Sequence, residues 1–114
     1  MGYSLKWYVL NEREEMKKWS ATFSRECVKY ENRNFRGYSR VFDAILSRSE
    51  DEANAGFAAI VKGHERECRG RGVFRYTDDE LLCVWGVGLA NLCRSRGLSV
   101  RPVPPLIPAD LLVK

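Results

Sequence analysis

The sequence predicts an all-α protein, a small bundle of about four helices with an extended proline-rich C-terminal tail packed on it. Three segments carry the same helix-start signature, and each precedes apolar residues at helical spacing. All four prolines lie after residue 100, where they prevent a further regular helix. The 114 residues are the length of one domain, and we expect residues 1–114 to fold as a single helical domain.

The helix-start signature is a capping box at Asn11–Glu14, Ser49–Glu52 and Thr77–Glu80. In each, the first side chain accepts a hydrogen bond from the third helical amide, and the glutamate reaches back to the cap amide. The acidic groups also lie at the positive end of the helix dipole. Three such boxes favour a helical protein.

We expect helices at about residues 12–31, 38–48, 50–68 and 78–96, with residues 32–37 as a loop. Each predicted helix has an apolar face at helical spacing. In the first two helices the faces are Met16, Trp19, Phe23, Cys27 and Tyr30, and then Val41, Phe42, Ile45 and Leu46. In the third and fourth they are Ala53, Phe57, Ile60, Val61 and His64, and then Leu81, Leu82, Trp85, Leu89 and Leu92. The third and fourth helices also contain small residues, namely Gly56, Ala59 and Gly63, and Gly86, Gly88 and Ala90. Because an interior glycine costs a helix roughly 1 kcal/mol, these positions predict close contact between helices.

The fourth helix should stop at Gly97, a typical left-handed cap, with Arg94 and Arg96 in its last turn. The tail after Gly97 is rich in aliphatic residues and ends in a predicted short turn at 108–112. We interpret it as packed on the bundle, because aliphatic residues favour burial. The alternative is an exposed polyproline segment for an aromatic groove.

The formal net charge is only +4, and basic and acidic residues are mixed along the chain. A dedicated nucleic-acid-binding protein has a denser basic cluster, so nucleic acid is disfavoured as a partner. We expect no signal peptide and no membrane span. The four cysteines contain no C-x-x-C pair, which favours reduced, buried thiols in a cytoplasmic protein.

The sequence offers no catalytic residues, no metal ligands and no cofactor motif, and we expect a protein that is not an enzyme. The single histidine, His64, belongs to the apolar face of its helix, and His64–Glu67 does not match the H-E-x-x-H metal motif. The acidic runs at Glu50–Glu52 and Asp78–Glu80 are explained by capping.

Two short segments combine arginines with aromatic residues, which is the composition of binding hot spots and of single-strand nucleic-acid platforms. The candidate partner-binding residues are Arg33, Phe35 and Arg36 in the first segment and Arg71, Phe74, Arg75 and Tyr76 in the second. The aromatic side chains either anchor these loops to the core or contact a partner, and the sequence leaves both open.

From about Val41 to Leu112 the chain resembles the C-terminal half of the immunity protein 49 family of bacterial polymorphic-toxin systems. The resemblance rests on a helix ending in Ile45-Leu46, an acidic turn, and a helix with Phe57 and His64-Glu65. It continues through LLCVWGVGLANLCRSRGL to the closing PLIPADLL. Residues 1–35 do not align, and the chain is shorter than typical members.

The resemblance implies a cytoplasmic, all-helical protein that binds and neutralises a cognate toxin by occlusion, without catalysis. The resemblance also implies that the toxin is delivered by contact-dependent or type VI secretion. Because this chain is slightly basic, we expect the toxin to present an acidic or neutral surface to the two loops. The alternatives are a helical nucleic-acid-associated protein using the same loops, and a helical adaptor or homodimer that self-associates through the Gly56/Gly63 or Gly86/Ala90 faces.

Overall fold

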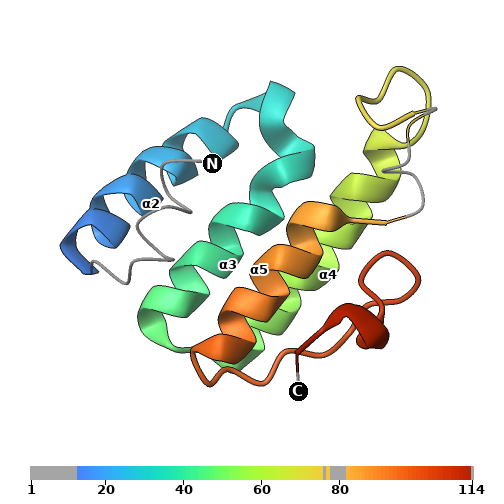
Figure 1. Cartoon of the computed structure of the whole chain (residues 1–114). Helices are drawn as coiled ribbons and strands as arrows, with labels where there is room; N and C mark the ends of the chain where they lie inside the picture. Colours follow the sequence, from blue (N-terminus) through green and yellow to red (C-terminus); the bar gives the residue numbers. More distant parts are fainter. Residues whose placement is uncertain (1–12, 76, 78–81, 114) are drawn as a thin grey trace.

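The computed structural model describes residues 13–75, 77 and 82–113. They form four α-helices and two 3-10 helices: α2 (Arg13–Cys27), η1 (Tyr30–Phe35), α3 (Arg36–Ser47), α4 (Glu50–Glu67), α5 (Val84–Ser95) and η3 (Ala109–Leu111). In Figure 1, α3 lies between α2 and α4, α5 runs along α4, and the tail lies beside both α4 and α5. The predicted all-α fold is confirmed.

Helix α4 agrees best with the sequence. Its N-cap is Ser49, whose hydroxyl accepts a hydrogen bond from the Glu52 amide at 3.3 Å, as the capping box predicts. Its predicted apolar face is buried throughout: Ala53, Phe57, Ile60, Val61 and His64. The helix ends at Glu67, one residue before the predicted end.

The first predicted helix is too long, and the predicted loop at 32–37 is wrong. Helix α2 ends at Cys27, and η1 and the start of α3 occupy the following segment. The guanidinium of Arg36 donates to the carbonyls of Cys27 and Val28, both at 2.8 Å, so the open end of α2 is satisfied by a side chain. Residues 11 and 12 of the first capping box lie outside the described residues.

The fourth helix begins at Val84 and not at residue 78. The amide of Cys83 donates to the carbonyl of Leu106 at 3.0 Å, so it joins the tail and not a preceding helical turn. The hydroxyl of Thr77 donates to the Phe74 carbonyl at 2.6 Å. Residues 78–80 of the predicted capping box lie outside the described residues.

The predicted end of this helix at Gly97 is confirmed. Gly97 has a φ of +84°, and the amides of Gly97 and Leu98 donate to the carbonyls of Arg94 and Cys93 at 3.0 and 3.1 Å. This pair of bonds is a Schellman cap, in which glycine is favoured at the left-handed position.

The tail is packed on the bundle, as predicted. Five of its aliphatic side chains are buried: Leu98, Val100, Leu106, Ile107 and Leu112. The guanidinium of Arg94 reaches across to the carbonyls of Val100 and Val113 at 2.6 and 2.7 Å. The predicted last turn is η3.

Glycines bring η1 and α3 directly against α4. A Cβ atom on Gly37 would lie 2.6 Å from the Ile60 nitrogen, and one on Gly56 would lie 2.6 Å from Cγ2 of Val41. A Cβ on Gly63 would overlap the backbone oxygen of Asn34. The close helix contact predicted from the small residues of α4 is therefore confirmed.

In α5 the close contact predicted at the small residues is found at only some of them. Gly86 is buried against Ile107, but a Cβ on Gly88 would have no atom within 4 Å. The Gly56/Gly63 and Gly86/Ala90 faces are buried inside the chain, so they are not the self-association surfaces that the sequence offered.

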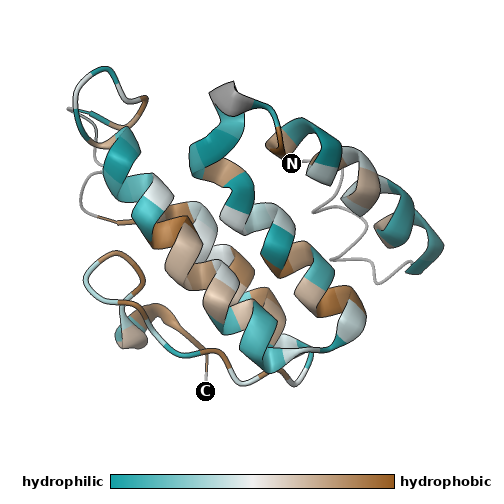
Figure 2. Cartoon of the chain, turned by 180° about the vertical axis from the view of Figure 1, so that it is seen from behind, coloured by the Kyte–Doolittle hydropathy of each residue, from teal (hydrophilic) through white to brown (hydrophobic). Residues whose placement is uncertain are grey.

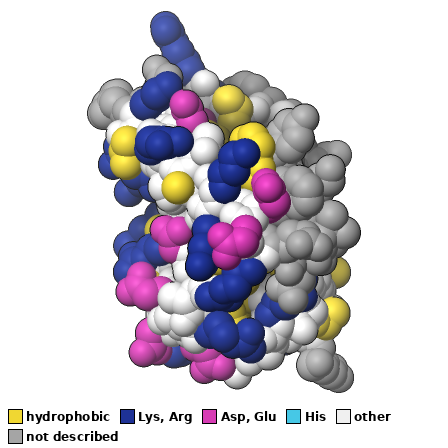
Figure 3. Space-filling model, turned by 90° about the vertical axis from the view of Figure 1, so that its left-hand side faces the viewer, with side chains coloured by type: hydrophobic (Ala, Val, Ile, Leu, Met, Phe, Trp, Pro, Cys, Tyr) yellow, Lys and Arg dark blue, Asp and Glu magenta, His cyan; other side chains and the backbone are white. Residues whose placement is uncertain are grey.

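The surface carries both charge signs. Figure 3 shows basic and acidic side chains interspersed over the visible face, as the sequence composition indicates. Among the described residues, no helix combines the length and apolar character required to cross a bilayer.

We expect Gly63→Ala to destabilise the protein by about 2–3 kcal/mol, because the added methyl group must displace backbone at a helix contact. Gly88→Ala is the matched control. Its methyl group enters open space in a helix, so the free energy of unfolding should rise by about 0.5–1 kcal/mol. Urea unfolding followed by circular dichroism measures both, and equal stability of the two variants would contradict the packing described here.

Candidate protein-binding site

The two arginine-aromatic segments meet at one end of the bundle, although they are far apart in the sequence. The rings of Phe35 and Phe74 are 6.4 Å apart in an edge-to-face arrangement. The Asn34 side-chain amide donates to the Glu67 carboxylate at 3.1 Å, which joins η1 to the end of α4. The sequence predicted each segment separately but not their contact.

The loop at residues 68–75 is folded back by Glu67. Its carboxylate accepts the Val73 amide at 3.2 Å, and its carbonyl accepts the Phe74 amide at 2.9 Å. The Arg75 guanidinium donates to the Gly70 carbonyl at 2.7 Å. The carboxylate of Glu67, the last residue of α4, thus bonds within the protein. Figure 2 shows the hydrophilic end of α4 that leads into the loop.

Phe74 points inward from this loop. Its ring stacks on His64 with a centroid distance of 4.3 Å and an interplanar angle of 21°. His64 is only 4% exposed, in agreement with its predicted place on the apolar face of α4. Its ring therefore packs within the fold beneath the loop.

The candidate aromatic residues and the candidate arginines differ in where the structure places them. Phe35 packs against the core, and Phe74 is buried against His64, which favours the anchoring interpretation for these two rings. Arg33, Arg71 and Arg75 lie at the surface. Arg36 is also at the surface, with its guanidinium bonded to the end of α2. Tyr76 lies outside the described residues.

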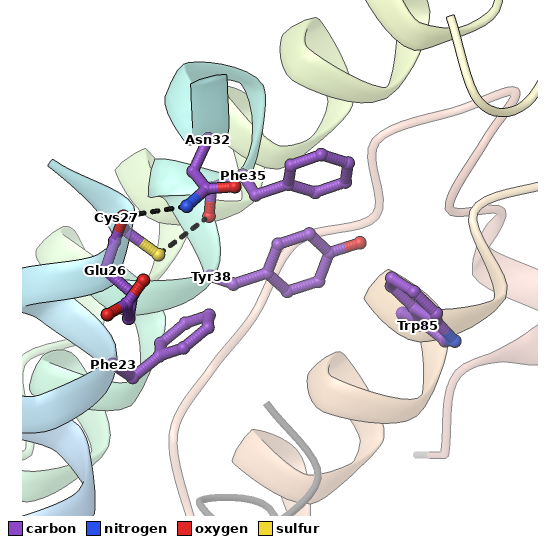
Figure 4. Close-up of a pocket in the computed structure, with 7 residues that line it drawn as sticks. All are labelled: Phe23, Glu26, Cys27, Asn32, Phe35, Tyr38 and Trp85. Atoms are coloured by element: carbon purple, nitrogen blue, oxygen red, sulfur yellow. Dashed lines mark hydrogen bonds between the residues drawn. The ribbon is translucent and has the colours of Figure 1, made fainter. Parts of the chain in front are cut away.

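Beside the contact between the two segments lies an aromatic hollow of about 240 Å³. Three helices and η1 supply its lining: Phe23, Glu26, Cys27, Asn32, Phe35, Tyr38 and Trp85. Figure 4 shows the rings of Phe23, Phe35 and Tyr38 along one side and Trp85 across from them. The lining is mainly apolar, which is typical of a binding pocket.

Trp85 is the exposed wall of the hollow. It is 54% exposed, and its ring lies 6.3 Å from both Tyr38 and Phe74 in edge-to-face contacts. The sequence placed Trp85 on the inward face of a longer helix, and that prediction is wrong. Because α5 begins only at Val84, Trp85 falls in its first turn, at the edge of the core.

Sequence reasoning missed the hollow itself. Phe23 and Trp85 were assigned to core faces, and Tyr38 to a predicted helix start. Their spacing gives no sign that they converge, because they come from three different helices. An indirect signal was available in the small residues of α4, which allow η1 and α3 to approach it closely.

Burial raises the pKa of two of the four thiols. Desolvation raises the pKa of the Cys27 thiol, which donates weakly to the Phe35 carbonyl at 3.8 Å. Burial raises the pKa of Cys93 to about 12. All four cysteines are described, and they form no disulfide. No group of three or more His, Cys, Asp or Glu side chains in the described part of the chain is arranged to hold a metal ion.

Comparison with known protein families, with curated proteins and with solved structures finds no match to this chain.

We expect Cys93 to react with iodoacetamide about a thousandfold more slowly at pH 8 in the native protein than in denaturant. A pKa of about 12 leaves that much less thiolate than an ordinary thiol has. The native rate should keep rising tenfold per pH unit above pH 9, where the denatured rate levels off. Mass spectrometry of the labelled peptides measures both rates, and equal native and denatured rates would contradict the burial of Cys93.

Proposed function

We propose that this protein is a non-catalytic, cytoplasmic immunity protein that binds a cognate bacterial toxin and neutralises it by occlusion. The proposal draws on the resemblance of residues 41–112 to the immunity protein 49 family. The structural observation that carries it is the half-exposed Trp85 at the edge of an aromatic hollow, next to surface arginines. Trp, Tyr and Arg are the residues most enriched in binding hot spots.

Exposed apolar residues support a contact at this end. Val84 and Trp85 are exposed and line a second, smaller depression with Phe74. Val73, next to Phe74, is also exposed. An isolated exposed hydrophobic residue is ordinary, whereas a group beside a hollow is typical of an interaction surface.

The surrounding charge favours an acidic or neutral partner surface. Arg66, Arg69, Arg71 and Arg75 are exposed in the segment 66–75, and its one acidic residue, Glu67, is bonded to Asn34 and Val73. Positive charge around an apolar centre steers association with an acidic protein surface.

A capture experiment tests this function. The tagged full-length chain is incubated with lysate of the source bacterium, treated with nuclease and washed at high salt, and bound proteins are identified by mass spectrometry. We expect one stoichiometric protein that stops growth when expressed alone and is harmless when co-expressed with this chain. Binding that disappears with nuclease or salt would favour a nucleic-acid-associated protein instead.

Charge reversal tests the basic surface. We expect Arg71→Glu combined with Arg75→Glu to weaken toxin binding about tenfold or more, mainly through slower association. The control is Lys17→Glu combined with Arg101→Glu, which reverses two exposed charges in α2 and in the tail. Surface plasmon resonance at two salt concentrations measures the rates, and equal loss in both double variants would rule out a specific role for the 68–75 loop.

A further inference from the structure

We propose that the aromatic hollow is an anchoring pocket for one aromatic or long aliphatic side chain of an acidic segment of the partner protein. In this arrangement the partner's side chain enters between Trp85 and the Phe23–Tyr38 side, and flanking carboxylates face the arginines. The inference rests on the proposed function in that it takes the partner to be a protein.

The size of the hollow suits such an occupant. An apolar cavity of about 150 Å³ is large enough to hold benzene. The hollow, at about 240 Å³, therefore has room for one phenyl or isobutyl group with the start of its backbone. A nucleobase stack of several rings would need an extended platform, which this concave site does not offer.

The lining favours an apolar occupant, because three of its polar groups are bonded within the protein. The Tyr38 hydroxyl lies 3.5 Å from the Cys83 sulfur, and the Asn32 side-chain amide donates to the Glu26 carbonyl at 2.9 Å. The Glu26 carboxylate is 3.0 Å from the Lys29 ammonium. The rings of Phe23, Phe35 and Tyr38 remain as the main walls, as Figure 4 shows.

The hollow is held in shape before any partner binds. Tyr38 is 3% exposed and forms its floor, and Phe35 packs between Tyr38 and Phe74. A preformed pocket avoids the entropy cost of ordering side chains on binding, so a single anchor contributes more to affinity.

The charges next to the hollow select acidic flanks. Arg33 follows the lining residue Asn32, and Arg75 follows Phe74, whose ring contacts both Phe35 and Trp85. The Arg36 guanidinium is bonded to the carbonyl of Cys27, which also lines the hollow. All three arginines are exposed and lie on the segments that line or contact the hollow, so carboxylates that flank the anchor side chain gain favourable longer-range interactions with them.

The probe is a blocked peptide, acetyl-Asp-Glu-Phe-Glu-Asp-amide, added to the ¹⁵N-labelled full chain. The readout is the indole N–H resonance of Trp85, assigned by its loss in Trp85→Phe. We expect this resonance to shift on titration, with an affinity about tenfold higher than for the same peptide with a central alanine. A peptide with lysine in place of the four acidic residues should also bind at least tenfold more weakly.

The matched variants are Trp85→Ala and Leu111→Ala. Both side chains are about half exposed, at 54% and 47%, so neither substitution removes a core residue. We expect Trp85→Ala to weaken binding of the phenylalanine peptide at least tenfold, and Leu111→Ala to leave it unchanged. Circular dichroism melting verifies that both variants are folded.

Three outcomes would contradict the proposal that the hollow is an anchoring pocket for a partner protein. These are equal binding of the phenylalanine and alanine peptides, no shift of the Trp85 resonance at millimolar peptide, or a dimer in sedimentation that Trp85→Ala abolishes. The last result would assign the hollow to a second copy of the chain.

Binding measurements with the captured toxin distinguish failure of this inference from failure of the proposed function. Toxin binding that survives Trp85→Ala overturns the anchor alone. Peptide binding by a chain that neither captures nor neutralises a toxin overturns the immunity function alone.

Discussion

The direct packing of backbone on backbone between α4 and the η1–α3 segment is the constraint on which the rest of the structure depends. Gly37, Gly56 and Gly63 leave out the Cβ atoms that would otherwise hold these elements apart. With η1 lying against the last turns of α4, Phe35 reaches Phe74 at the base of the next loop. The position of the aromatic hollow thus follows from a helix contact elsewhere in the fold.

The tail sets the other wall of the hollow. The Leu106 carbonyl accepts the Cys83 amide, and Ile107 packs over Gly86, so the first turn of α5 is fixed by residues some twenty positions later. Arg94 then ties the end of the same helix to the Val100 and Val113 carbonyls. Because Trp85 lies in that first turn, its placement beside Tyr38 depends on the tail, which is therefore part of the site's scaffold.

Sequence reasoning succeeded where the signal is local. Ser49 caps α4 through an amide three residues away, and Gly97 ends α5 through bonds within one turn, so both could be predicted. Sequence reasoning failed where a residue distant in the sequence determines the start or the end of a helix. The start of α5 depends on Leu106, and the end of α2 is satisfied by the Arg36 side chain from the next helix. The arginine and aromatic segments were identified by composition, but their meeting depends on helix packing.

The exposure of Trp85 has an energetic consequence. Exposed apolar area costs roughly 25 cal/mol per Å² relative to burial, and tryptophan has the largest side chain. Here the indole is half exposed while its neighbour Tyr38 is buried and the smaller Leu89 of the same helix is in the core. A partner that covers Trp85 and fills the hollow recovers this free energy without reorganising the helices. In the complex that we propose, positive charge near the hollow guides the approach of the partner, and apolar contact at its centre holds the two proteins together.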